Sequence, residues 1–153
     1  MNHGFLYGAQ GLAGNVLVAV DGSENSQRAF EFALEYAEKF SYGLTVVNVS
    51  ESSAAAAFAG DGMASVARDL RRFHEGILEK AVEHAKNTHP AVAVTTVLRE
   101  GDPATEIVAA ANEGNFDVVV VGHRGLGKVK GLLLGSISEK VIRSLGHTVI
   151  LVR

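Results

Sequence analysis

Residues 118–136 read VVVVGHRGLGKVKGLLLGS, and this stretch decides the fold. The four consecutive valines at 118–121 are typical of a strand buried on both faces, as in a parallel sheet. A glycine-rich turn follows, and Gly135-Ser136 stands just ahead of a helical pattern. A strand, a glycine turn and a helix N-terminus in this order indicate an anion site. Glycines let backbone N–H groups approach a phosphate, and the helix end adds partial positive charge.

Strand and helix patterns alternate along the rest of the chain. Runs rich in Val, Ile and Leu, typical of buried strands, lie at 15–20, 44–49, 92–98, 117–121 and 148–152. The helical patterns between them begin after Ser23 and stop at Gly43, cover 63–87, begin at Asp102-Pro103, and cover 136–145. This alternation predicts an α/β fold: an open five-stranded parallel sheet with helices on both faces, in a Rossmann-like three-layer sandwich.

Local signals support the helix boundaries. Ser23 and Asp102 are favoured N-cap residues, and Pro103 suits the first helical position. The long helix over 63–87 carries apolar residues at helical spacing, which we expect to form its buried face. These residues are Val66, Leu70, Phe73, Ile77, Ala81 and Ala85.

The chain of 153 residues is long enough for one domain with its own core. We expect that domain over 15–153, preceded by a flexible arm over 1–14 that carries four glycines. Small and polar residues gather at 50–62, which predicts a mobile loop there.

Strand order decides where a ligand would bind. In the order 3-2-1-4-5 the winding reverses between the first and fourth strands, and ligands of open parallel sheets bind at such a point. This order would bring Asp21 and Gly22, after the first strand, beside Gly122 and Gly125, after the fourth.

Composition excludes several classes of function. A net charge of −3 gives no electrostatic reason to bind nucleic acid, and the absence of cysteine excludes disulfides, thiolate metal sites and a Cys nucleophile. No apolar stretch approaches the roughly 20 residues that span a bilayer, and the N-terminus is a poor signal peptide. No His, Asp and Glu set has metal-ligand spacing. We therefore expect a cytoplasmic protein with no metal site of its own and no nucleic-acid or membrane partner.

Two common nucleotide motifs fail at the glycine turn. The dinucleotide pattern G-x-G-x-x-G, started at Gly125, requires glycine where Lys130 stands. The P-loop pattern fits from Gly122 to Lys128, but Val129 lacks the hydroxyl that would bind magnesium. The spacing that fits is G-x2-G-x9-G-[ST], at Gly122, Gly125, Gly135 and Ser136.

This spacing resembles the nucleotide-binding branch of the universal stress protein family. The resemblance covers roughly residues 15–153. It includes the first strand's ending Val20-Asp21-Gly22-Ser23, the helix entry Gly101-Asp102-Pro103 and the closing strand TVILVR.

The resemblance implies a domain that binds ATP, or AMP or ADP, with Mg²⁺ held mainly by the phosphates, usually as a homodimer. It implies that Asp21 lies near the adenosine, that Ala19 and Val20 line its pocket, and that the backbone of Val49 contacts adenine. It also implies that a loop wraps the ribose and phosphates and that a helix start holds the phosphates. The loop residues are Val121, Gly122, His123, Arg124, Gly125, Leu126 and Gly127, and the helix-start residues are Gly135, Ser136 and Ile137.

Structural readings of the same residues stay open. Gly122 and Gly125 could be strand-to-helix punctuation, and Asp21 or Ser136 could serve only as an N-cap. His123 is as well suited to solvent as to a ligand. The cations Arg124, Lys128 and Lys130 either reach a triphosphate or form a solvated basic loop.

Three functions fit the sequence. The favoured one is an ATP-binding regulatory or stress-response module with little or no hydrolysis, acting on an unidentified protein partner. The alternatives are a slow ATPase or nucleotidyl-transfer enzyme in the same crevice, and a nucleotide-free dimeric scaffold. Thr148–Val152 is an apolar strand at a predicted sheet edge, and pairing of two such edges predicts a homodimer.

Overall fold

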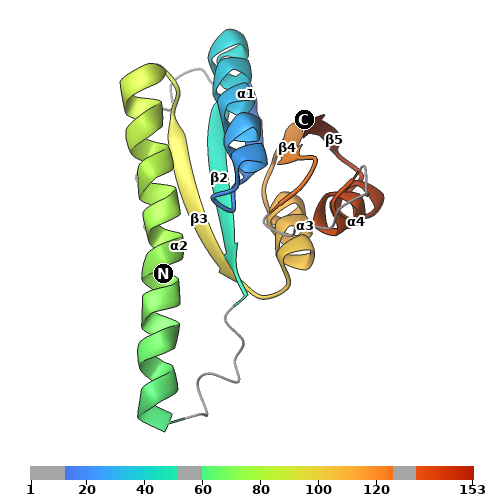
Figure 1. The fold of residues 1–153 in the computed structure, drawn as a ribbon. Coiled ribbons are helices and arrows are strands. Elements are labelled where there is room, and N and C mark those ends of the chain that lie inside the picture. The colour runs from blue at the N-terminus through green and yellow to red at the C-terminus, as the bar shows by residue number, and fades with distance from the viewer. Residues whose placement is uncertain (1–12, 52–59, 126–133) are drawn as a thin grey trace.

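The computed structural model describes residues 13–51, 60–125 and 134–153. Strands and helices alternate without exception across these residues (Figure 1). The elements are β1 (Asn15–Ala19), α1 (Glu24–Phe40), β2 (Gly43–Ser50), α2 (Gly60–Thr88), β3 (Val94–Glu100), α3 (Pro103–Glu113), β4 (Val118–Gly122), α4 (Ser136–Ser144) and β5 (Thr148–Val152). The elements predicted from the sequence are all present, with ends shifted by a few residues. The predicted arm at 1–14 and loop at 50–62 lie largely outside the described residues.

The five strands form one parallel sheet in the order β3-β2-β1-β4-β5, as predicted. Val16 of β1 is in register with Leu44 of β2 on one side and with Val118 of β4 on the other. The winding therefore reverses between β1 and β4. None of the helices in the described part of the chain has the length and apolar content that crossing a bilayer requires.

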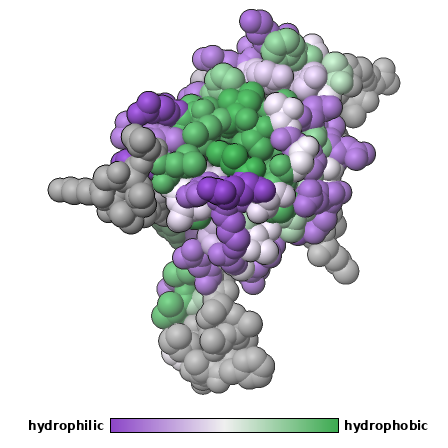
Figure 2. Space-filling model, turned by 90° about the vertical axis from the view of Figure 1, so that its right-hand side faces the viewer, coloured by the Kyte–Doolittle hydropathy of each residue, from purple (hydrophilic) through white to green (hydrophobic). Residues whose placement is uncertain are grey.

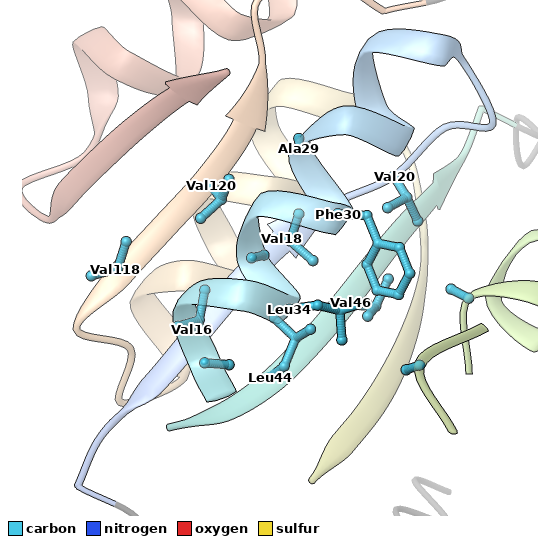
Figure 3. Close-up of a cluster of buried hydrophobic side chains, with 14 of the residues drawn as sticks. Val16, Val18, Val20, Ala29, Phe30, Leu34, Leu44, Val46, Val118 and Val120 are labelled. Atoms are coloured by element: carbon cyan, nitrogen blue, oxygen red, sulfur yellow. The ribbon is translucent and has the colours of Figure 1, made fainter. Parts of the chain in front are cut away.

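The sheet has a hydrophobic core on each face because successive strand residues point to opposite sides. Val16 and Val18 pack with Phe30 and Leu34 of α1, beneath α1 and α2 (Figure 3). Leu17, between them in sequence, packs on the other face with residues of α3 and α4. A fully buried side chain of this kind contributes about 1.5–3 kcal/mol relative to an exposed one. The two cores hold the five strands in place, so that their carboxyl ends lie together at one end of the sheet.

Helix α1 ends earlier than predicted. Its C-cap is Ser41, which adopts a left-handed backbone conformation with φ of 55°, and Tyr42 N–H donates to Ala37 O at 2.8 Å. Gly43, which we expected to stop the helix, instead opens β2, where its N–H donates to Gly14 O at 2.9 Å. Serine thus takes the position that glycine usually holds after a helix.

Helix α2 is buried over only half of its length. Ala81 and Ala85 are buried as predicted, but Val66, Leu70 and Phe73 are 51%, 39% and 60% exposed. The prediction that these three are buried is wrong because α2 extends past the ends of the strands, where no sheet lies beneath it (Figure 1). An apolar stripe therefore continues beyond the core to the edge where the strands end.

Candidate functional site

The turn after β1 is built by three consecutive residues. Asp21 Oδ1 accepts a hydrogen bond from Ser23 N–H at 2.9 Å, and Ser23 Oγ accepts one from Ser26 N–H at 3.1 Å. Gly22 between them has φ of 84°, which side-chain-bearing residues rarely adopt. Ser23 is therefore the N-cap of α1, as predicted, and the Asp21 carboxylate is held at the turn rather than at the cap position.

The two glycine clusters meet as the strand order predicts. A Cβ on Gly125 would lie 2.7 Å from Asp21 Oδ2, so the absence of a side chain lets the loop after β4 come this close to the carboxylate. A Cβ on Gly122 would lie 2.9 Å from the backbone oxygen of Asn25, at the start of α1. Close packing against backbone thus requires glycine at 122, and a side chain at 125 would have to displace the Asp21 carboxylate.

The start of α4 is held against the end of β4. Gly135 N–H donates to His123 O at 2.7 Å, and a Cβ on Gly135 would lie 3.2 Å from the Cα of Arg124. The buried Ser138 donates its hydroxyl to Gly122 O at 2.7 Å. The glycine turn and the helix start therefore form one unit at the sheet edge.

Gly135 is the N-cap of α4, and no side chain caps this helix. The reading of Ser136 as an N-cap is wrong, because Ser136 is the first helical residue. The amides of the first helical turn have no acceptor within the helix, so those of Ser136 and Ile137 can donate to a bound anion.

A cavity of about 530 Å³ opens where these elements meet, within the size range of small-molecule sites. Its lining includes nine residues that the sequence singled out: Ala19, Val20, Asp21, Val49, Val121, Gly122, Arg124, Gly125 and Ile137. Gly135 and Ser136 adjoin it without lining it.

Three other residues that were predicted to contact the ligand, His123, Leu126 and Gly127, are not among the described residues that line the cavity. The side chain of His123 lies outside it, and its Nδ1 is buried with no hydrogen-bond partner in the described part of the chain. Leu126 and Gly127 fall outside the described residues, as do the cations Lys128 and Lys130. Their contacts with a ligand stay predictions.

Sequence reasoning missed one wall of the cavity. Eight residues that the sequence did not assign to the site also line the cavity: Val47, Glu51, Leu70, Phe73, His74, Pro103, Ile107 and Ser138. Leu70 and Phe73 come from the half of α2 that extends past the sheet. His74 lies next to them, over β2, and Pro103 and Ile107 come from α3. A signal existed in the sequence: the apolar stripe of the long helix is longer than strands of five to eight residues can cover.

A salt bridge connects α3, which forms part of the cavity wall, to α4. Asp102 caps α3 by accepting from Thr105 N–H at 2.9 Å, and it accepts from Lys140 Nζ at 2.9 Å. Hydrogen bonds from Thr105, then from Lys140, hold the pKa of Asp102 well below its usual value. Asp102 is therefore ionised at neutral pH and connects the two helices that border the cavity.

The fold and the cavity define an open, doubly wound parallel α/β domain with a ligand-sized site where the winding reverses. The model of the Universal stress protein family matches residues 13–153, and the chain belongs to that family. Universal stress protein YxiE of Bacillus subtilis is 30% identical over 146 residues, covering 90% of this chain and 97% of that protein.

Two solved structures extend the comparison. The universal stress protein UspA from Lactobacillus plantarum shares the fold, with a TM-score of 0.77 at 23% identity, over 94% of this chain and all of that one. A universal stress protein in complex with cAMP has a TM-score of 0.66 at 27% identity, over 92% of this chain and 96% of that one.

Proposed function

We propose that this chain binds an adenine nucleotide, ATP foremost, in the cavity between β1, β4 and α2. The observation that carries the proposal is the meeting of Asp21 with Gly125 beside the start of α4, around one ligand-sized space. This arrangement gives the cavity a polar end and an apolar end, as a nucleotide requires.

The polar end suits phosphates. The amides of Ser136 and Ile137 stand at the positive end of the α4 dipole, and Arg124 lines the same side. Glycine at 125 leaves the backbone uncovered there. Mg²⁺ would neutralise phosphate charge when bound, and we expect the phosphates themselves to be its main ligands.

The apolar end suits a base. It is lined by Val47, Val49 and Ile107, together with the α2 side chains that face the cavity, which are Leu70, Phe73 and His74. The backbone of Val49, at the end of β2, remains the contact that we propose for adenine. The relative of known structure that was solved with cAMP makes adenine nucleotides the first class of ligand to test.

The proposed role is regulatory rather than catalytic. A bound nucleotide would favour the conformation in which the loops at the cavity are ordered, and so change the population of a surface that a protein partner recognises. Hydrolysis requires a positioned water and usually a base. Asp21 is already bonded to Ser23 N–H, and the other lining acid, Glu51, is exposed. We expect turnover close to background.

The direct test is analysis of small molecules released from the purified protein, followed by calorimetric titration with ATP. Intact ATP after hours of incubation supports a binding module, whereas conversion to ADP or AMP supports the slow enzyme. ATPase activity that Asp21→Ala or Glu51→Gln abolishes while binding persists would refute the regulatory role. If millimolar ATP fails to raise the melting temperature, the nucleotide-free scaffold is favoured.

We also propose that the chain forms a homodimer through β5. This strand is the edge strand of the sheet. Leu151 on β5 and Ile142 on the neighbouring α4 are both exposed. Figure 2 looks onto the side of the molecule that carries β5 and α4 and shows a broad hydrophobic area framed by hydrophilic residues. Pairing of two β5 edges would cover this area and satisfy the open backbone groups. We expect this dimer to act in the cytoplasm.

A further inference from the structure

His74 and Asn48 connect the cavity to the interior of the fold. Asn48 lies on β2 and is 1% exposed, and its Nδ2 donates to Val20 O at 2.7 Å. Its Oδ1 lies 2.6 Å from Nδ1 of His74, which lines the cavity from α2. The pair thus joins the end of β1, the buried face of β2 and the cavity wall.

This chain of hydrogen bonds fixes the protonation pattern of the His74 ring. A carbonyl oxygen such as Val20 O can only accept, so the Asn48 amide must present its NH₂ there and its oxygen to His74. Nδ1 of His74 must then carry the proton. In the neutral ring the other nitrogen, Nε2, is therefore an acceptor, and among the described residues it has no hydrogen-bond partner.

The surroundings of His74 favour a base over a phosphate. A neutral imidazole acceptor repels an anion, so its ligand group must be a donor. Helix α2 packs on β2 and β3, on the opposite face of the sheet from α4, whose start suits phosphates. Phe73 is beside His74, with ring centroids 5.4 Å apart and planes at 81°, and adds an aromatic surface that suits a flat base.

We propose that His74 selects the base by accepting a hydrogen bond from its exocyclic amino group through Nε2, with Asn48 as the positioning residue. This rests on the proposed nucleotide binding. A base with an amino group at purine position 6 is accepted, and one with an oxygen there is rejected because two acceptors would face each other. ATP and ITP differ at this position in that way, which makes them matched probes.

The test is calorimetric titration of wild type, His74→Phe and His89→Phe with ATP and with ITP. His89 directly follows the C-terminal end of α2 and lies outside the cavity lining, so it is the control. We expect wild type and His89→Phe to prefer ATP by about tenfold, the size of one hydrogen bond lost to a mismatch. His74→Phe should lose that preference, because ATP loses the hydrogen bond and ITP no longer faces an acceptor. A purely structural role for His74 would weaken both ligands equally.

Equal affinity of wild type for ATP and ITP, or a preference that survives in His74→Phe, would overturn the inference while leaving nucleotide binding intact. Binding of neither ligand would instead refute the proposed function. A second measurement does not depend on the variant's folding. Nitrogen-15 NMR of the wild-type histidines at neutral to alkaline pH should show His74 protonated at Nδ1 and bare at Nε2. The reverse tautomer would contradict the role of Asn48.

Discussion

The carboxylate of Asp21 lies against Gly125, so close that a Cβ on Gly125 would stand 2.7 Å from Oδ2. The other carboxylate oxygen accepts from Ser23 N–H at 2.9 Å. Asp21 is therefore confined between the turn after β1 and the loop after β4. Any side chain at 125 has to move an acid that is already bonded.

Gly125→Ala should weaken ATP binding by tenfold or more. The added methyl group would push the Asp21 carboxylate away from Ser23 N–H and change the shape of the cavity on that side. Calorimetry with ATP measures the loss, and circular dichroism checks that the fold is kept. Gly76→Ala is the matched control, because nothing lies within 4 Å of its Cβ position. Unchanged affinity in Gly125→Ala would show that the ligand does not depend on this contact.

Gly76→Ala should raise the free energy of unfolding by about 0.5–1 kcal/mol, because glycine inside a helix costs that much relative to alanine. Gly76 lies within α2, where a methyl group meets open space. Gly22→Ala should lower the same quantity by about 1–2 kcal/mol, since φ of 84° is strained for alanine. Urea denaturation measures both. Equal effects of the two substitutions would contradict this account of the turn.

Asp102→Asn should destabilise the fold at pH 7 and do so less at acidic pH. Asparagine still caps α3, so the substitution removes chiefly the charge that Lys140 contacts. Because the folded state lowers the pKa of Asp102, its contribution is complete well above the ordinary value of 3.8 and is lost as pH falls through and below it.

Urea denaturation of wild type and Asp102→Asn at pH 7 and at pH 3 checks this. The difference between the two proteins should shrink at pH 3. A difference that grows toward acid would mean that the sign of the pKa shift is wrong. Lys140→Gln, which removes the partner charge but keeps the cap, should show the same trend.

Leu151→Glu should convert the proposed dimer to a monomer while leaving the protomer folded. Leu151 is 39% exposed on the edge strand, so a charge costs little in the monomer but is buried without a partner at a β5–β5 interface. Sedimentation velocity at micromolar concentration measures the mass. Val66→Glu, on the exposed half of α2, is the control and should keep the wild-type mass. A monomeric wild type would refute the dimer outright.

Much of the fold could be predicted from periodicity. Runs such as Val118–Val121 are apolar on both faces, which occurs in a parallel sheet covered on both sides. The strand order needed more than periodicity. We assume the order 3-2-1-4-5, from which Asp21 is expected to lie beside Gly125, and the structure confirms both the order and this proximity.

The wall contributed by α2 could not be predicted in the same way. An apolar stripe indicates contact with something apolar but not whether that partner is a sheet or a cavity. The sequence therefore predicts Val66, Leu70 and Phe73 to be buried, whereas the structure exposes them. His74 was missed for a related reason, because its function depends on Asn48, which is 26 residues away in sequence.

Small deviations at helix ends have local causes. Ser41 adopts the left-handed conformation that ends α1, and Gly43 is the first residue of β2. Gly135 takes the N-cap of α4, where a Cβ would lie 3.2 Å from Arg124 Cα and from His123 O, so a larger residue would require these neighbours to shift by a few tenths of an ångström. Close packing at this position works against the usual preference for serine as an N-cap.

The most direct test of the central claim is a crystal structure of this protein grown with ATP and Mg²⁺. This claim predicts phosphate oxygens within hydrogen-bond distance of the Ser136 and Ile137 amides, with the base at the apolar end beside Val49 and His74. A cavity that stays empty at saturating ATP, or a nucleotide bound elsewhere with those amides turned to other partners, would contradict it.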